Sequence, residues 1–296
     1  MLAPDTLAVL RNDFGIGEAA LARLDDLAGV YAGRGLLREG QTLPLHDVCP
    51  HRDECWAECQ HAAPPDDYAG ISLPWIGGSY EDGRVLVVGI NFHDWGGLLA
   101  NWYVCSDHQR QQQAGRQGKS GHPFALAAMA YTAVVLNSLD GREVGHGDVP
   151  RPQDVAALWD RIAFLQGIKC APRTNRSRPT DAMFANCPGF LLVEEIERLH
   201  PHAVILLGRG ALRDAVRPRL TEHFGLEWGD CPGHLERDTF LLRGAPVQLF
   251  SLYHPSYPDW RKSLRQLVDM LGPAPYHEAP RTPWLVELPG RLSGLS

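Results

Sequence analysis

The chain has 296 residues, a net charge of −7 and a hydrophobic fraction of 44%. This composition is typical of a globular protein with a sizeable core, and the lack of any long apolar run predicts that no helix spans a membrane. The negative charge argues mildly against a nucleic-acid partner.

The first forty residues contain one amphipathic pattern, over 17–29, which predicts a helical extension ahead of the main domain. No basic stretch followed by a long apolar stretch is present at the start, so we expect no signal peptide and a cytoplasmic protein. In a reducing compartment, clustered cysteines bind metals more often than they form disulfides.

The stretch CPHRDECWAEC at 49–59 brings Cys49, Cys55 and Cys59 close together in sequence. Three thiols are one short of the four that close a zinc site or an iron–sulfur cluster. Cys170 follows a strand pattern, and Cys187 precedes a proline that suits the first position of a helix. We therefore expect Cys187 at a helix N-terminus, where the helix dipole favours a thiolate. These two cysteines, with two of the first three, complete a set of four.

Four continuous apolar runs predict strands that are covered on both faces: 85–90, 162–168, 203–207 and 247–253. Helical patterns accompany them at 123–138, 153–160, 188–199 and 209–222. This alternation predicts a three-layer α/β/α fold with a central four-stranded parallel sheet. We expect an N-terminal extension over 1–45, one domain over 46–272 and a Pro-rich tail over 273–296. Ligands of such sheets bind at the carboxyl ends of the strands.

Several motifs occur along the chain in a characteristic order. They are CPHRDECWAEC, GINF (89–92), GHPF (121–124), KCAPRTNR, NCPGFL and HPSY. In this order, over about 49–271, they resemble the iron–sulfur uracil-DNA glycosylases of the uracil-DNA glycosylase superfamily. The resemblance implies a four-iron, four-sulfur (4Fe-4S) cluster on Cys170, Cys187 and two of Cys49, Cys55 and Cys59. An all-cysteine set also suits zinc, so both metals stay open.

The resemblance also implies catalytic roles. His254 would donate a hydrogen bond to the uracil carbonyl as negative charge accumulates, and Phe124 would stack on the base. Asn91 would orient the attacking water, although the iron–sulfur family carries Gly-Glu-Ala-Pro-Gly at this motif. Ile90 replaces that glutamate, so the route of water activation departs from the family pattern.

Gln166 stands where the family has an asparagine that reads the uracil edge. Its amide offers one donor and one acceptor, as the imide of uracil requires, but it is one methylene longer. A glutamine that only satisfies backbone groups at a strand end is the alternative interpretation. Gly89, Phe92 and Ser256 complete the expected substrate-binding residues.

Basic and aromatic residues near these motifs suit DNA. We expect Arg173, Arg176 and Arg261 to contact phosphates and Tyr257 to enter the gap left by a flipped base. Trp260 either acts as a second wedge or packs inward on an amphipathic helix.

The sequence thus predicts a monomeric, monofunctional DNA glycosylase that hydrolyses the N-glycosidic bond of uracil or a related deaminated base in DNA. The alternative is an iron–sulfur DNA-binding or sensing module with the same fold and little or no cleavage. A zinc-stabilised hydrolase of a small nucleoside is a third hypothesis.

Overall fold

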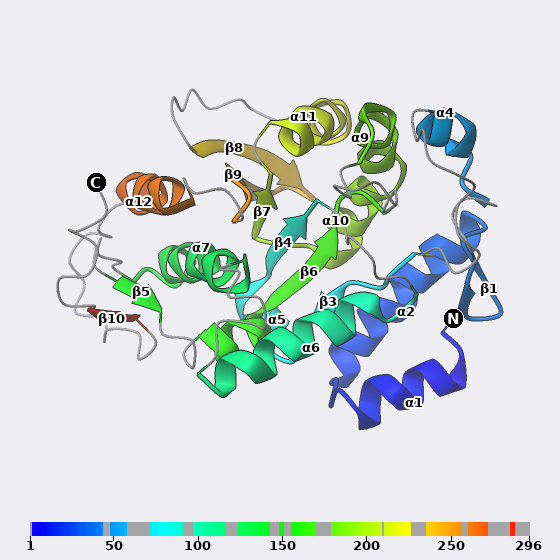
Figure 1. The fold of residues 1–296 in the computed structure, drawn as a ribbon, viewed down its shortest axis with the longest axis horizontal. Coiled ribbons are helices and arrows are strands. Elements are labelled where there is room, and N and C mark those ends of the chain that lie inside the picture. Colours follow the sequence, from blue (N-terminus) through cyan, green and yellow to red (C-terminus); the bar gives the residue numbers. More distant parts are fainter. Residues whose placement is uncertain are drawn as a thin grey trace.

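The computed structural model describes residues 2–43, 48–57, 71–90, 97–115, 124–142, 148–150, 155–169, 179–208, 210–225, 235–255, 260–271 and 285–287. Its centre is a six-stranded sheet in the order β3-β6-β4-β7-β9-β8 (Figure 1). The middle four strands are parallel: β6 (Ile162–Gln166), β4 (Val85–Gly89), β7 (Ala203–Leu207) and β9 (Ala245–Leu252). Antiparallel strands β3 (Trp75–Ile76) and β8 (Leu235–Leu242) form the two edges.

The four strands expected from the sequence are the four parallel ones, and every residue of β4, β6 and β7 is buried. Burial on both faces explains their unbroken apolar composition. The predicted number of strands was wrong, because the edges carry weaker signals. β3 has two residues, and the sequence of β8, LERDTFLL, is interrupted by three consecutive charged residues. A tight turn at Arg243 and Gly244, both with positive φ, returns β8 into β9.

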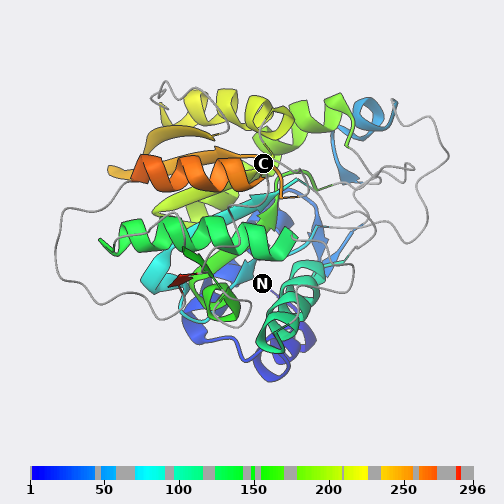
Figure 2. The same cartoon turned by 60° about the vertical axis from the view of Figure 1, so that its left-hand side comes forward.

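Helices cover both faces of the sheet, which confirms the three-layer α/β/α arrangement. Helices α7 (Phe124–Leu139) and α12 (Trp260–Leu271) contact each other and lie side by side on one face (Figure 2). Helices α10 (Val193–Leu199) and α11 (Ala211–Phe224) lie on the other face (Figure 1). Helix α7 is buried along most of its length, in keeping with its apolar sequence.

The remaining elements surround this framework. The helices are α1 (Pro4–Asn12), α2 (Glu18–Gly33), α4 (Arg52–Ala57), α5 (Tyr80–Gly83), α6 (Ala100–Gln113) and α9 (Asp181–Cys187). Two short antiparallel pairs join β1 (Leu37–Arg38) to β2 (Gln41–Thr42) and β5 (Asp148–Pro150) to β10 (Leu285–Glu287). The helix predicted over 153–160 is mostly a 3₁₀ turn, η1 (Ala157–Arg161). Within the described ranges, no helix is both long and apolar enough to cross a bilayer.

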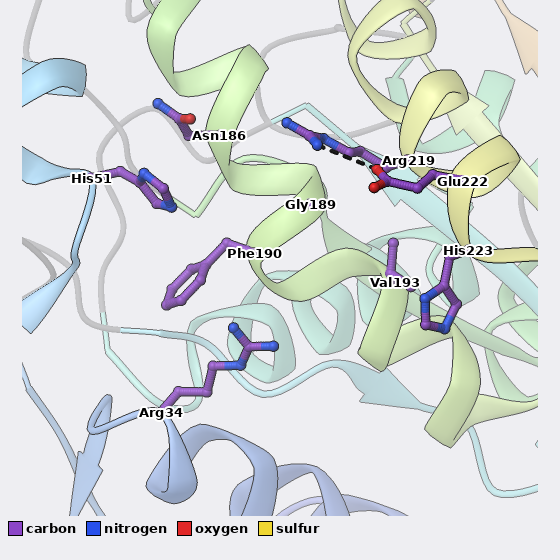
Figure 3. A pocket seen from close by; sticks show the side chains of 9 residues that line it. All are labelled: Arg34, His51, Asn186, Gly189, Phe190, Val193, Arg219, Glu222 and His223. Atoms are coloured by element: carbon purple, nitrogen blue, oxygen red, sulfur yellow. Dashed lines mark ion pairs between the residues drawn. The ribbon is translucent and has the colours of Figure 1, made fainter.

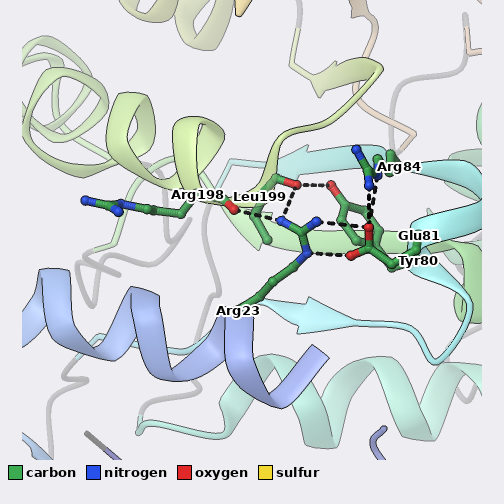
Figure 4. A network of polar contacts seen from close by, with 6 residues as sticks. All are labelled: Arg23, Tyr80, Glu81, Arg84, Arg198 and Leu199. Atoms are coloured by element: carbon green, nitrogen blue, oxygen red, sulfur yellow. Dashed lines mark hydrogen bonds and ion pairs between the residues drawn. The ribbon is translucent and has the colours of Figure 1, made fainter. Parts of the chain in front are cut away.

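Helix α2 is fastened to the C-terminal end of α10 by Arg23 (Figure 4). The Arg23 guanidinium donates to the carbonyl oxygens of Arg198 and Leu199 at 2.9 and 3.2 Å, and its Nε lies 2.5 Å from Oε1 of Glu81. The Tyr80 hydroxyl donates to the same Leu199 oxygen at 3.2 Å. These donors satisfy carbonyls that the end of helix α10 leaves unpaired. Helix α2 therefore stabilises the C-terminal end of α10.

Candidate functional site

The carboxyl ends of β4 and β6 meet at Gly89 and Gln166, which are paired in register. The pairing continues beyond the strands, because the amide of Gly167 donates to the Gly89 carbonyl and that of Ile168 to the Ile90 carbonyl, both at 2.8 Å. The backbone hydrogen bonds between the two segments are therefore continuous at the edge of the sheet that is predicted to bind the base.

Gln166 is 7% exposed, and its Oε1 has no hydrogen-bond partner among the described residues. A buried, unsatisfied carbonyl oxygen costs free energy unless a ligand or water satisfies it. The interpretation of Gln166 as a residue that only satisfies backbone groups does not account for this oxygen.

Glycine is required at position 89 by the close approach of Gln166. A Cβ on Gly89 would lie 2.4 Å from Oε1 of Gln166 and 3.2 Å from its Cδ and Nε2. The Gln166 amide therefore occupies the space that a side chain at position 89 would fill.

Phe124, the first residue of α7, lies against His254, which follows the end of β9. Their ring centroids are 5.2 Å apart at an interplanar angle of 38°, and both side chains are partly exposed. Phe124 also meets the Phe164 ring edge-on at 6.5 Å. Phe164 and Gln166 are two residues apart on β6, so they face the same side of the sheet. An aromatic face, an imidazole and an amide thus gather at one edge of the sheet.

Helix α7 also fixes the segment that carries His254. The Tyr131 hydroxyl donates to the Trp260 carbonyl at 2.9 Å and lies 3.5 Å from that of Tyr253. Trp260 is 5% exposed, which resolves its two interpretations in favour of inward packing. Arg261 is exposed, with its guanidinium 4.9 Å from the centroid of the Trp260 ring.

Ile90, at the position of the family glutamate, makes an apolar contact. A Cβ on Gly208, which follows β7, would come within 2.9 Å of Cγ1 of Ile90. The side chain therefore packs across the end of β7 and offers no group that could take a proton from water.

Three of the five candidate metal-binding cysteines gather where α4 packs on α9. Burial is the main cause that raises the pKa of Cys55 to about 11, and the neighbouring Cys187 and Cys49 thiols add to the rise. Burial and Cys187 likewise raise the pKa of Cys49. The Asn186 amide donates to Cys55 Sγ at 3.7 Å. Within the described ranges, no three His, Cys, Asp or Glu side chains form a ready-made metal site, and Cys59 and Cys170 fall outside those ranges.

The prediction that Cys187 opens a helix was wrong. Cys187 is the last residue of α9, which starts after Thr180 and is capped by it, since the Thr180 hydroxyl accepts from the Met183 amide at 3.2 Å. The chain continues through a π-helical turn, η2 (Pro188–Leu192), directly into α10. Proline lacks the N–H of a regular helical bond, and a widened turn accommodates it. Cys187 therefore lies at the C-terminal end of α9, where the helix dipole does not favour a thiolate.

A cavity of about 420 Å³ lies between η2 and α11, and Asn186, which precedes Cys187, is part of its lining (Figure 3). Its basic side chains already face carboxylates: Arg34 pairs with Glu194, Arg219 with Glu222 at 3.6 Å, and the His223 imidazole lies 2.9 Å from Glu197. Its walls are thus largely balanced in charge, and none of the predicted site residues lines it. The lining residues are Arg34, His51, Asn186, Gly189, Phe190, Val193, Arg219, Glu222 and His223.

Eight predicted site residues lie outside the described ranges, and their roles stay predictions. They are Cys59, Asn91, Phe92, Cys170, Arg173, Arg176, Ser256 and Tyr257. Sequence reasoning missed Glu195, a fully buried carboxylate that contacts Lys169 and Tyr31. Nothing in the sequence of α10, VEEIERL, distinguishes this buried glutamate from the other glutamates of the helix.

A family model described as the uracil DNA glycosylase superfamily matches residues 110–271, more than half of the chain. The matched stretch contains Phe124, Gln166 and His254 and starts after Gly89. No curated protein matches the chain. The family match and the α/β/α fold agree with the geometry at the strand ends, and the chain therefore belongs to the uracil-DNA glycosylase superfamily.

Proposed function

We propose that the protein is a monofunctional DNA glycosylase that hydrolyses the N-glycosidic bond of uracil, or of a related deaminated base, in DNA. Members of its superfamily are glycosylases that act on DNA. The observation that carries the proposal is the Gln166 amide oxygen, buried and without a partner in the described part of the chain, on the same side of β6 as the Phe124 contact. An everted base with a donor N–H would satisfy that oxygen.

The proposed chemistry breaks the bond between the sugar and the base nitrogen, and the electron pair leaves with the base. Phe124 stacks on the flipped base, Gln166 hydrogen-bonds its edge, and His254 donates a hydrogen bond to the carbonyl where charge develops. Water adds to the cationic sugar and loses its proton to solvent. Asn91 would orient this water, but a side-chain amide cannot accept a proton from it at neutral pH. Stabilisation of the departing nucleobase therefore supplies most of the rate enhancement.

Further parts of the proposal concern partners and location. Arg173, Arg176, Tyr257 and Arg261 would contact the DNA, and the protein would act as a cytoplasmic monomer. The exposed position of Arg261 at the start of α12 supports its role.

We also propose a 4Fe-4S cluster, with zinc as the alternative, on Cys170, Cys187 and two of Cys49, Cys55 and Cys59. The donor chemistry fits, because the Cys49, Cys55 and Cys187 thiols are near enough to raise one another's pKa and the Asn186 amide donates to Cys55 Sγ, as donors around cluster thiolates do. The bound group would supply a cross-link between α4 and α9.

The direct test incubates the purified protein with oligonucleotides that contain uracil, hypoxanthine or xanthine, and then cleaves abasic sites with alkali. We expect strand scission with at least one of these substrates and none with the undamaged control. DNA binding without scission on all three would replace the glycosylase with the binding-module alternative. The Ile90 contact with Gly208 favours that alternative, since it leaves no carboxylate at this position.

Replacement of Gly89 by alanine is expected to impair excision much more than folding. The new methyl group would displace the Gln166 amide, the flexible end of a side chain, so the backbone can stay in place. Because small misplacements of a positioning group are costly, we expect the rate of excision to fall by about 10²-fold. Single-turnover excision and thermal unfolding measure the two effects. Gly29→Ala is the matched control, because a Cβ there meets nothing within 4 Å, and equal losses in both variants would contradict the assignment.

A further inference from the structure

Glu195 on α10 is fully buried, and all of its described partners come from other parts of the chain. Nζ of Lys169 lies 2.8 Å from Oε1 and 2.7 Å from Oε2 of Glu195. The Tyr31 hydroxyl on α2 donates to Oε1. A buried carboxylate is tolerated only when it is paired and hydrogen-bonded, and here one cation and one neutral donor satisfy it.

Lys169 connects Glu195 to the strand end that carries Gln166. Its Nζ donates to the backbone carbonyl of Gln166 at 2.6 Å, in addition to the two Glu195 oxygens. The three protons of the ammonium group therefore have three acceptors. The interaction folds 166–169 back on itself, immediately after the strand β6 that presents the Gln166 amide.

Tyr31 remains a donor at neutral pH. Burial, the main cause, and the Glu195 carboxylate together raise the pKa of its hydroxyl well above the ordinary value. The Tyr31 hydroxyl therefore joins helix α2 to Glu195 on α10 as a hydrogen-bond donor at neutral pH.

We propose that Tyr31, Glu195 and Lys169 form a positioning relay, through which helix α2 holds the Gln166 amide in its base-reading orientation. This inference rests on the proposed function for its catalytic consequence. Gln166 Oε1 has no partner in the described part of the chain to hold it, so its orientation depends on the backbone that Lys169 fixes and on the space left by Gly89.

The principal variant is Tyr31→Phe, which removes one hydroxyl and keeps the ring. Tyr80→Phe is its matched control, because Tyr80 is also a buried tyrosine that donates to α10, but its hydroxyl bonds to the Leu199 carbonyl instead of Glu195. We expect Tyr31→Phe to lower the excision rate by about tenfold at unchanged DNA affinity. Tyr80→Phe should leave the rate within about twofold of the wild type.

A double-mutant cycle separates positioning from general destabilisation. If Tyr31 acts through Gln166, the effect of Tyr31→Phe should vanish in a Gln166→Ala background. The same fold-loss in both backgrounds would overturn the relay. Glu195→Gln is not suitable for this cycle, because it leaves Lys169 buried beside a neutral partner and mixes loss of folding with loss of positioning. The cycle therefore uses Tyr31→Phe.

A second readout does not depend on catalysis. In protein labelled with ¹⁵N-glutamine, the side-chain NH₂ signal of Gln166 is identified by its loss in Gln166→Ala. We expect Tyr31→Phe to shift this signal and Tyr80→Phe to leave it in place. A Gln166 signal that is unmoved by Tyr31→Phe overturns the inference, whether or not the protein excises any base. Absence of excision together with a shifted signal would refute the proposed function and uphold the relay.

Discussion

Replacement of His254 by alanine is expected to slow base release by about 10²–10³-fold, the usual loss when one preorganised donor to a developing anion is removed. The imidazole lies 5.2 Å from the Phe124 ring, at one edge of the base-binding region, and is partly exposed. It would contribute mainly when charge builds on the departing base, so DNA affinity should change by less than about threefold. Single-turnover excision and fluorescence anisotropy with a labelled duplex measure the two quantities.

His223→Ala is a suitable control, because this imidazole sits on α11 and pairs with Glu197, not with a predicted site residue. It should excise at the wild-type rate. If His254→Ala lost affinity and rate in equal proportion, the histidine would hold the DNA and not the leaving group.

Replacement of Cys187 by alanine is expected to destabilise the protein by at least about 3 kcal/mol and to remove the bound metal, because metal binding and folding are coupled in such sites. The loss of stability has two sources: the metal loses one ligand, and the cross-link between α4 and α9 is lost with it. For a chain of this size, the midpoint of thermal unfolding should fall by roughly 6–12 °C. Absorbance near about 400 nm, with analysis for iron, sulfide and zinc, identifies the metal in the parent protein.

Cys105→Ala provides the comparison, since this thiol is fully buried in α6 and is not among the thiols that adjoin Cys55. It should keep the full metal content and lose only about 1–2 kcal/mol from the small cavity. Purified parent protein without iron or zinc, or equal behaviour of the two variants, would contradict the metal proposal.

The core of the fold could be predicted because its signal is local. Continuous apolar runs mark β4, β6 and β7, which are buried on both faces, whereas the edge strands β3 and β8 lack such runs. Pro188 misled the prediction of the helix start, because a π turn lets the chain pass through it. Thr180 was the better signal, as a capping residue followed by an acidic first turn.

The residues of the candidate site could be named from motifs, but their relations could not. The pairing of Gly89 with Gln166 depends on the register between two strands that are far apart in sequence. Glu195 follows another glutamate, and only the packing of α2 against α10 decides which of the two is buried. Burial of a charged side chain is a property of the tertiary structure.

Through Tyr131, helix α7 positions both aromatic groups that the proposed function assigns to the base. Phe124 is the first residue of this helix, and the Tyr131 hydroxyl, about two turns later, binds a carbonyl on the segment that follows His254. Any sliding of the helix along its axis would carry the ring and the imidazole in the same direction. The contact between the two rings would therefore be kept, and the stacking and hydrogen-bonding groups would hold their relative positions.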